Sequence, residues 1–197
     1  MHGRLDRVVQ ATLAPGAVAA LSARARAIVA AAEGPVLDVG CGFSSPLLHA
    51  GIRPVGVDID PARAGAHGRN APAVVADAAR LPFVDGAFAA AVSIGLLHHL
   101  TDRAARRAIL EMMRVVRPGG PVAVFDGVLP AAPARRPLAR LIRALDHGRN
   151  MRDEGELRAL FDGIPGWHYQ RMTYAMTGLE GVWCICRATG KRNADRK

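Results

Sequence analysis

Short apolar segments alternate five times with helix-like segments along most of this chain, and two strand-like segments then close it. Apolar strands separated by helices are typical of a parallel sheet covered on both faces. The last two strand-like segments follow each other without a helix between them, which indicates an antiparallel hairpin. We therefore predict an α/β fold with a mostly parallel, seven-stranded sheet and a C-terminal antiparallel hairpin.

The predicted strands are 36–39, 54–60, 73–77, 87–94, 121–126, 167–175 and 181–187. The predicted helices are 15–32, 46–50, a long helix that starts after Thr101, and a short one that starts after Asp153. Ser45 and Thr101 are candidate N-cap residues, and Asp153 with Glu156 resembles a capping box. The residues Arg-Pro-Gly-Gly at 117–120 should end the long helix.

The composition indicates one globular domain in a reducing compartment. Half of the 197 residues are apolar and only three are cysteines, and the N-terminal residues lack the order of a secretory signal. No apolar run is long enough to cross a bilayer, and Cys184-x-Cys186 alone is not a zinc site. We therefore expect a cytoplasmic protein and no metal.

Lysine and arginine outnumber aspartate and glutamate by 26 to 17, which gives a net charge of +9. We interpret most of the arginines as lying on solvated helix faces, because only residues 135–143 and the tail at 191–197 cluster them. Attraction to phosphate, in RNA or in an anionic lipid, is the alternative interpretation.

A glycine turn follows the first predicted strand, in the stretch Val-Leu-Asp-Val-Gly-Cys-Gly. Gly40 and Gly42 allow a sharp turn and the close approach of a ligand. A dehydrogenase pattern would continue with glycine at position 45, where this chain has Ser45. An acid at Asp38 is useful near a ligand that carries an amino group.

Two further acids end the next two predicted strands. Asp58 lies twenty residues after Asp38 and can accept hydrogen bonds from both hydroxyls of a ribose, and Asp77 can accept one from the exocyclic amine of adenine. The carboxyl ends of these strands are where such sheets bind ligands. The pattern favours a ligand made of ribose, adenine and an amino acid, with no cradle for two phosphates.

With these residues the chain resembles the class I S-adenosylmethionine-dependent methyltransferases, in the small-molecule subgroup that includes the ubiquinone/menaquinone C-methyltransferases. The motifs "VLDVGCG", "GVDIDP", "ADAARLPFVDGAF", "SIGLLHHLTD" and "EMMRVVRPGGPVAVFD" stand in order over about residues 36–128. The resemblance implies a Rossmann-like three-layer sandwich, S-adenosylmethionine as cofactor, and a single methyltransferase domain over 1–190. That domain would include an N-terminal helical segment at 1–34 and would be followed by a basic tail at 191–197.

The resemblance also implies which residues bind the cofactor. The methionine end would lie against Asp38, Gly40, Cys41 and Gly42, the ribose hydroxyls on Asp58, the adenine against Ile59, Asp77 and the Ala78 amide, and Ser93 beneath the methionine. Two positions depart from the family pattern. Ser44 replaces a third glycine and could crowd or hydrogen-bond the methionine carboxylate, and Ala89 replaces an aspartate that is mostly structural.

Methyl transfer from a sulfonium needs positioning and removal of a proton from the acceptor. His98 and His99 lie at the end of the fourth predicted strand, and Asp126 ends the fifth. We expect Asp126 to hold one nitrogen of His98 and to leave the other as a general base. The alternative is that both histidines are structural, one packing in the helix-capping turn and the other over the cofactor. No "Asn-Pro-Pro-Tyr"-like motif follows, so O- or C-methylation is expected before methylation of a base or amide nitrogen.

Residues 129–152 form a predicted insertion between the fifth strand and the last helix. An amphipathic helix within it could cover an apolar or lipidic acceptor, and its basic face could contact an anionic membrane surface. Ordinary packing of this helix on the domain is the alternative. The leading interpretation is methyl transfer to a small-molecule acceptor. A catalytically silent S-adenosylmethionine-binding protein and an RNA methyltransferase remain open, although nucleic acid is not the expected partner because no stacking surface is evident.

Overall fold

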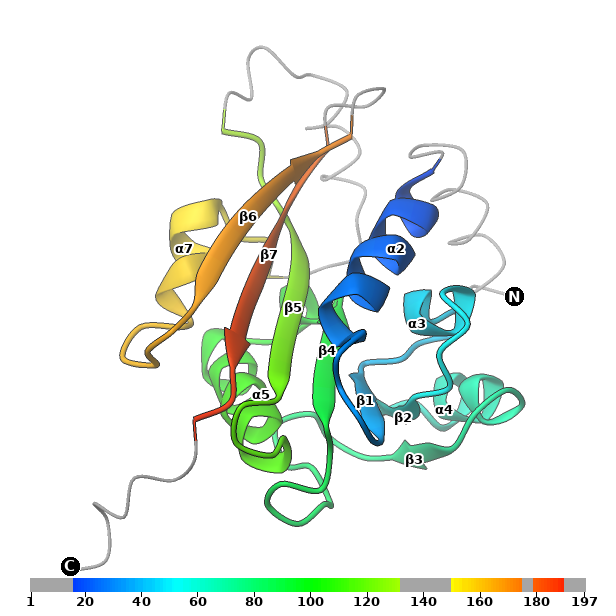
Figure 1. Ribbon diagram of the computed structural model, residues 1–197. Coiled ribbons are helices and arrows are strands. Elements are labelled where there is room, and N and C mark those ends of the chain that lie inside the picture. Colours follow the sequence, from blue (N-terminus) through cyan, green and yellow to red (C-terminus); the bar gives the residue numbers. More distant parts are fainter. Residues whose placement is uncertain (1–15, 132–149, 175–178, 190–197) are drawn as a thin grey trace, which may run out of the picture.

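The computed structural model describes residues 16–131, 150–174 and 179–189, which form one seven-stranded sheet with helices on both faces (Figure 1). The strand order is β3-β2-β1-β4-β5-β7-β6. The strands are β1 (Val36–Val39), β2 (Val55–Asp58), β3 (Ala73–Val75), β4 (Ala90–Ile94), β5 (Pro121–Val128), β6 (His168–Thr173) and β7 (Glu180–Arg187). The first five are parallel, and β7 is antiparallel to both β5 and β6. The predicted α/β fold is confirmed.

The described helices are α2 (Ala17–Val29), α3 (Pro46–His49), α4 (Pro61–Gly68), α5 (Asp102–Val115) and α7 (Glu154–Ala159), with a 3-10 turn, η1, at Leu97–His99. The predicted caps are confirmed. Ser45 Oγ accepts from the Leu47 amide at 3.1 Å, the Thr101 side chain accepts from the Ala104 amide, and Asp153 with Glu156 forms a capping box. Helix α4 and η1 were not predicted.

Each face of the sheet has its own hydrophobic core. One face is covered by α2 and α3, with Ala25, Val29 and Leu47 packing on strand residues that include Val92 and Trp183. The other is covered by α5 and α7, with Ile109, Met112, Leu157 and Phe161 packing on strand residues that include Val39 and Val124. Both faces of the central strands are therefore buried, which explains why those strands have no polar alternation.

The direction of the strand order changes at β1. From β1 the chain moves outward to β2 and β3, and then returns to β4 on the other side of β1. In open α/β sheets, ligands bind at the carboxyl ends of strands where the order reverses in this way. The glycine turn after β1, the acid that ends β2 and the histidine turn after β4 all lie at this edge.

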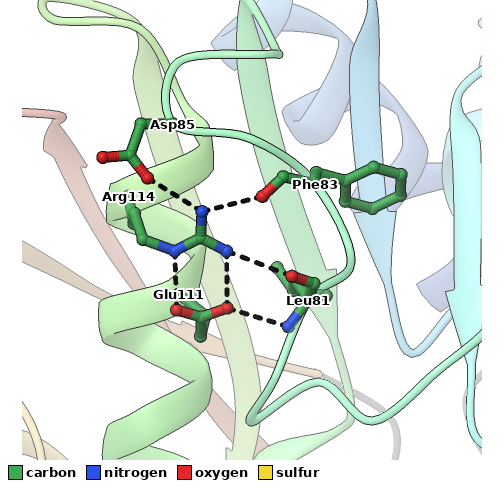
Figure 2. Close-up of polar contacts among 5 residues, drawn as sticks. All are labelled: Leu81, Phe83, Asp85, Glu111 and Arg114. Carbon is green, nitrogen blue, oxygen red and sulfur yellow. Dashed lines mark hydrogen bonds and ion pairs between the residues drawn. The ribbon is translucent and has the colours of Figure 1, made fainter.

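A partly buried ion-pair network fixes the loop between β3 and β4 to helix α5 (Figure 2). The Arg114 guanidinium donates to both carboxylate oxygens of Glu111 at 2.7 Å and to the carbonyls of Phe83 and Leu81 at 2.7 and 3.1 Å. It also donates to Asp85 at 2.9 Å. Glu111 in turn accepts from the Leu81 amide at 2.8 Å. The side-chain hydrogen bond from Arg114 lowers the pKa of Glu111. The loop that follows Asp77 is therefore held by two residues of one helix.

Arg114→Met should reduce the free energy of unfolding by about 2–3 kcal/mol, because it leaves two carbonyls and a partly buried carboxylate without their donor. Asp85→Asn is the matched control. It removes only the partner whose side chain is half exposed, and should cost about 0.5 kcal/mol or less. Urea unfolding followed by circular dichroism measures both.

The difference in stability between wild type and Arg114→Met should depend on pH in a definite direction. The folded-state pKa of Glu111 is lowered, so its pairing with Arg114 stabilises the protein above the ordinary glutamate pKa and is lost as the pH falls. The gap between wild type and Arg114→Met should therefore narrow in acid. Equal stability of the two proteins at neutral pH would contradict the role given to this network.

Candidate active site

The glycine turn after β1 has a conformation that only glycine adopts easily. Gly40 and Gly42 have φ angles of +75° and +58°, and the amides of Gly40 and Cys41 both donate to the carbonyl of Val57 in β2, at 2.8 and 3.0 Å. A Cβ atom at Gly40 would lie 2.9 Å from a methyl carbon of Leu96. The turn is therefore fixed to β2 on one side and is close-packed against the segment after β4 on the other.

Asp38 is a buried acid in β1, two residues before Gly40 of this turn. Its side chain accepts a hydrogen bond from the Ser45 hydroxyl, and the residue is 3% exposed. Burial raises the pKa of Asp38 to about 6, against the opposing effect of the Ser45 hydrogen bond. A carboxyl group kept in a site that disfavours its charge is typical of functional sites. Ser45 was predicted only as an N-cap, so its contact with Asp38 is new.

Asp58 connects the end of β2 to the glycine turn. One carboxylate oxygen accepts from the Gly42 amide and the other from the Asp60 amide, each at 3.0 Å. Each oxygen keeps a second lone pair that could accept a hydroxyl. The predicted ribose-binding acid and the predicted glycine turn are therefore in direct contact.

The residues predicted for the adenine lie further along the same edge. Ile59 is 70% exposed, an unusual position for a large apolar side chain next to a buried strand. Asp77 is exposed and caps its own loop by accepting from the Ala79 amide at 2.8 Å. Ala78 is partly buried. An exposed apolar side chain and an exposed acid at the same edge of the sheet suit a flat ring with a hydrogen-bond donor on its edge.

Three other residues that the sequence places near the methionine end are buried or hydrogen-bonded within the protein. The Ser93 hydroxyl is fully buried and donates to the Val39 carbonyl at 2.9 Å, which joins β4 to β1. Cys41 is buried, and burial raises the pKa of its thiol to about 12, so the thiol stays protonated at neutral pH. Ser44 hydrogen-bonds to His49 at 2.7 Å. The Ser44 hydroxyl is thus directed to α3.

His98 and Asp126 are paired across the ends of β4 and β5. His98 Nδ1 lies 2.5 Å from Asp126 Oδ1, and the His98 amide donates to Oδ2 at 2.8 Å. The side chains are 12% and 2% exposed. With the proton on Nδ1, the basic lone pair of the ring is on Nε2. The ring of His99 packs on that of His98, with centroids 4.1 Å apart.

Arg152 was missed by the sequence analysis, although it is close to this pair. It is buried, and its guanidinium contacts η1 and the start of α5. Nothing next to Arg152 in the sequence indicates a contact with residues about fifty positions earlier.

Only the ends of the predicted insertion at 129–152 are described. Its proposed amphipathic helix lies outside the described residues, as does the tail at 191–197.

Neither a metal site nor a membrane span is found in the described part of the chain. No group of three or more histidine, cysteine, aspartate or glutamate side chains is placed there to hold a metal ion. No described helix is both long enough and apolar enough to span a bilayer.

Methyltransferases are found among the known proteins that resemble this chain in sequence and in structure. Residues 37–124 match the family described as "Methyltransferase domain". A human protein named "Probable tRNA methyltransferase 9B" is 39% identical over 93 residues, which are 46% of this chain and 20% of that protein. The demethylmenaquinone methyltransferase of Corynebacterium kroppenstedtii is 39% identical over 98 residues, which are 49% of this chain and 35% of that enzyme.

The solved structures extend the similarity to the whole fold. A SAM-dependent methyltransferase from Thermotoga maritima superposes with a TM-score of 0.72 at 16% identity, over 96% of each chain. The chain spans about a fifth of the length of the first curated relatives that it matches. Residues 37–124 thus match a methyltransferase domain, and the chain has the fold of S-adenosylmethionine-dependent methyltransferases.

Proposed function

We propose that this chain transfers the methyl group of S-adenosylmethionine to a small-molecule acceptor, at a hydroxyl or at an acidic carbon. The observation that carries the proposal is the contact between His98 and Asp126, at 2.5 Å, at the carboxyl ends of β4 and β5. A catalytically silent cofactor-binding protein would need the glycine turn and Asp58 but would have no use for a buried carboxylate–imidazole pair beside them.

The residues of the chain divide the work between binding and proton transfer. The cofactor supplies a methyl group already activated on a sulfonium sulfur. Asp58 and the glycine turn would hold it by the ribose and the methionine end. Nε2 of His98 would take the proton of the acceptor as the acceptor forms its bond to the methyl carbon. Asp126 would fix the His98 ring and stabilise the imidazolium.

Transfer to RNA is the second candidate, because a relative that matches this chain is named as a tRNA methyltransferase and the net charge is +9. The matched segment covers the half of the domain that we expect to bind the cofactor. Methyltransferases that act on different kinds of acceptor can have this half in common. We favour a small acceptor because a general base such as His98, paired with a carboxylate, suits the deprotonation of a hydroxyl or of an acidic carbon.

We also propose that residues 1–190 act as one domain in the cytoplasm.

A screen for S-adenosylhomocysteine formation tests the proposed acceptor class. Phenols, sugars and quinone precursors form one arm, and unmodified tRNA forms the other. We expect turnover with a member of the first arm and none above background with tRNA. Asp58→Ala is the control for cofactor-dependent signal. Methyl incorporation into tRNA that persists in high salt would overturn the proposal, since non-specific RNA contacts weaken steeply with salt.

A further inference from the structure

Arg152 is buried against the turn that carries His98. The residue is 6% exposed, and its guanidinium donates to the carbonyls of Leu97 and Leu100 at 2.8 and 2.7 Å. It also donates from Nε to Asp102 at 2.9 Å. Leu97 and Leu100 lie on either side of His98 and His99 in the chain. One planar group therefore holds the turn at both of its ends.

The segment that carries Arg152 contacts the same turn through its backbone. The Asn150 amide donates to the His98 carbonyl at 3.0 Å, and the Leu129 amide donates to the Arg152 carbonyl at 2.9 Å. Val128 and Arg152 form an isolated parallel bridge beside β5. The backbone of His98 is thus held by Asp126 through its amide and by Asn150 through its carbonyl.

We propose that Arg152 is a positioning residue that keeps His98 in contact with Asp126. This inference rests on the proposed function of the pair. A three-residue 3-10 turn has few internal hydrogen bonds of its own, so its orientation depends on outside donors. The guanidinium supplies several donors in a fixed plane, an arrangement that a lysine cannot reproduce. Without it, the imidazole can move away from the carboxylate.

The ion pair with Asp102 does not account for the arrangement. The side chain of Asp102 is 83% exposed while that of Arg152 is 7% exposed, and exposed carboxylates contribute little to such pairs. Two other charged side chains take part in these contacts, since Asp126 accepts from His98 and Asp102 accepts from Arg152, while the His99 ring packs on that of His98. The two backbone carbonyls are therefore the contacts whose loss should matter.

The test compares Arg152→Lys and Arg152→Met with Asp102→Asn as the matched control. On a verified acceptor, kcat should fall roughly 10- to 100-fold in both arginine variants, as expected for a displaced catalytic group. The KM for S-adenosylmethionine should stay unchanged. Asp102→Asn should behave like wild type. Thermal unfolding shows which variants are folded. If Arg152→Met is not folded, the comparison is made with Arg152→Lys alone.

A second measurement needs neither acceptor nor cofactor. In protein labelled with 15N-histidine, NMR should show the Nδ1 proton of His98 in a strong hydrogen bond in wild type and in Asp102→Asn, and should show it weakened in Arg152→Lys. The inference would be overturned if Arg152→Lys lowered the thermal stability but left the His98 resonance and the pH–rate profile as in wild type. Arg152 would then be only structural. If His98→Ala turned over normally while Arg152→Lys still altered the His98 resonance, the proposed function would fail and the positioning role would stand.

Discussion

Replacing His98 with alanine should lower turnover by roughly a hundredfold or more while the affinity for S-adenosylmethionine hardly changes. The residue lies in the turn after β4, where its ring contacts Asp126, whereas Asp58 and the glycine turn are joined to each other at the end of β2. Loss of the ring should therefore remove proton transfer and leave the cofactor residues in place. Steady-state kinetics on a verified acceptor, with calorimetry for the cofactor, measures the two effects separately.

Asp126→Asn should damage the same step, and the double variant should be little worse than either single one, because the two side chains act as one unit. The wild-type pH–rate profile should contain a limb in the range where imidazole titrates, and His98→Ala should lack it. His168→Ala, at an exposed histidine on the edge strand β6, is the control and should behave like wild type. Normal turnover by His98→Ala would show that the histidine is structural.

Replacing Asp58 with alanine should weaken cofactor binding by about 2–4 kcal/mol, since a carboxylate makes charge-assisted hydrogen bonds to hydroxyls. The structure adds a second reason. Asp58 also holds the Gly42 amide at 3.0 Å, so its loss should loosen the turn that approaches the methionine end. Titration calorimetry with S-adenosylhomocysteine measures the change.

Asp60→Asn is the matched control for this variant. Asp60 lies two residues away and caps α4 by accepting from the Ala62 amide, a role that asparagine can fill. Its affinity for S-adenosylhomocysteine should stay within about twofold of wild type, a difference below 1 kcal/mol. Unchanged affinity in Asp58→Ala, or tighter binding of NAD than of S-adenosylhomocysteine by the wild type, would refute the assignment of this site.

The fold could be predicted because its signals are local. Mostly apolar strands, N-caps such as Ser45 and Thr101, and the Arg-Pro-Gly-Gly stop at 117–120 each act over a few residues. Helix α4 was missed because it buries two alanines and His67 in place of large apolar side chains, and because it contains Gly65. Its start signal, Asp60 followed by Pro61, was nevertheless present.

The site could be predicted where strand order alone brings residues together. The carboxyl ends of neighbouring parallel strands must meet, so the contacts of Asp58 with Gly42 and of His98 with Asp126 follow from the topology. Arg152 could not be predicted, because its contacts with Leu97 and Leu100 depend on how the chain returns after β5. The Ser44 contact with His49 depends on side-chain orientation, which no sequence pattern specifies.

A crystal structure of the chain with S-adenosylhomocysteine tests the central claim most directly. The account predicts the ribose hydroxyls on the Asp58 carboxylate, the adenine against Ile59 with its amine toward Asp77, and the sulfur facing the side of the site where His98 and Asp126 lie. A ligand bound away from the glycine turn, or one whose ribose makes no contact with Asp58, would contradict it.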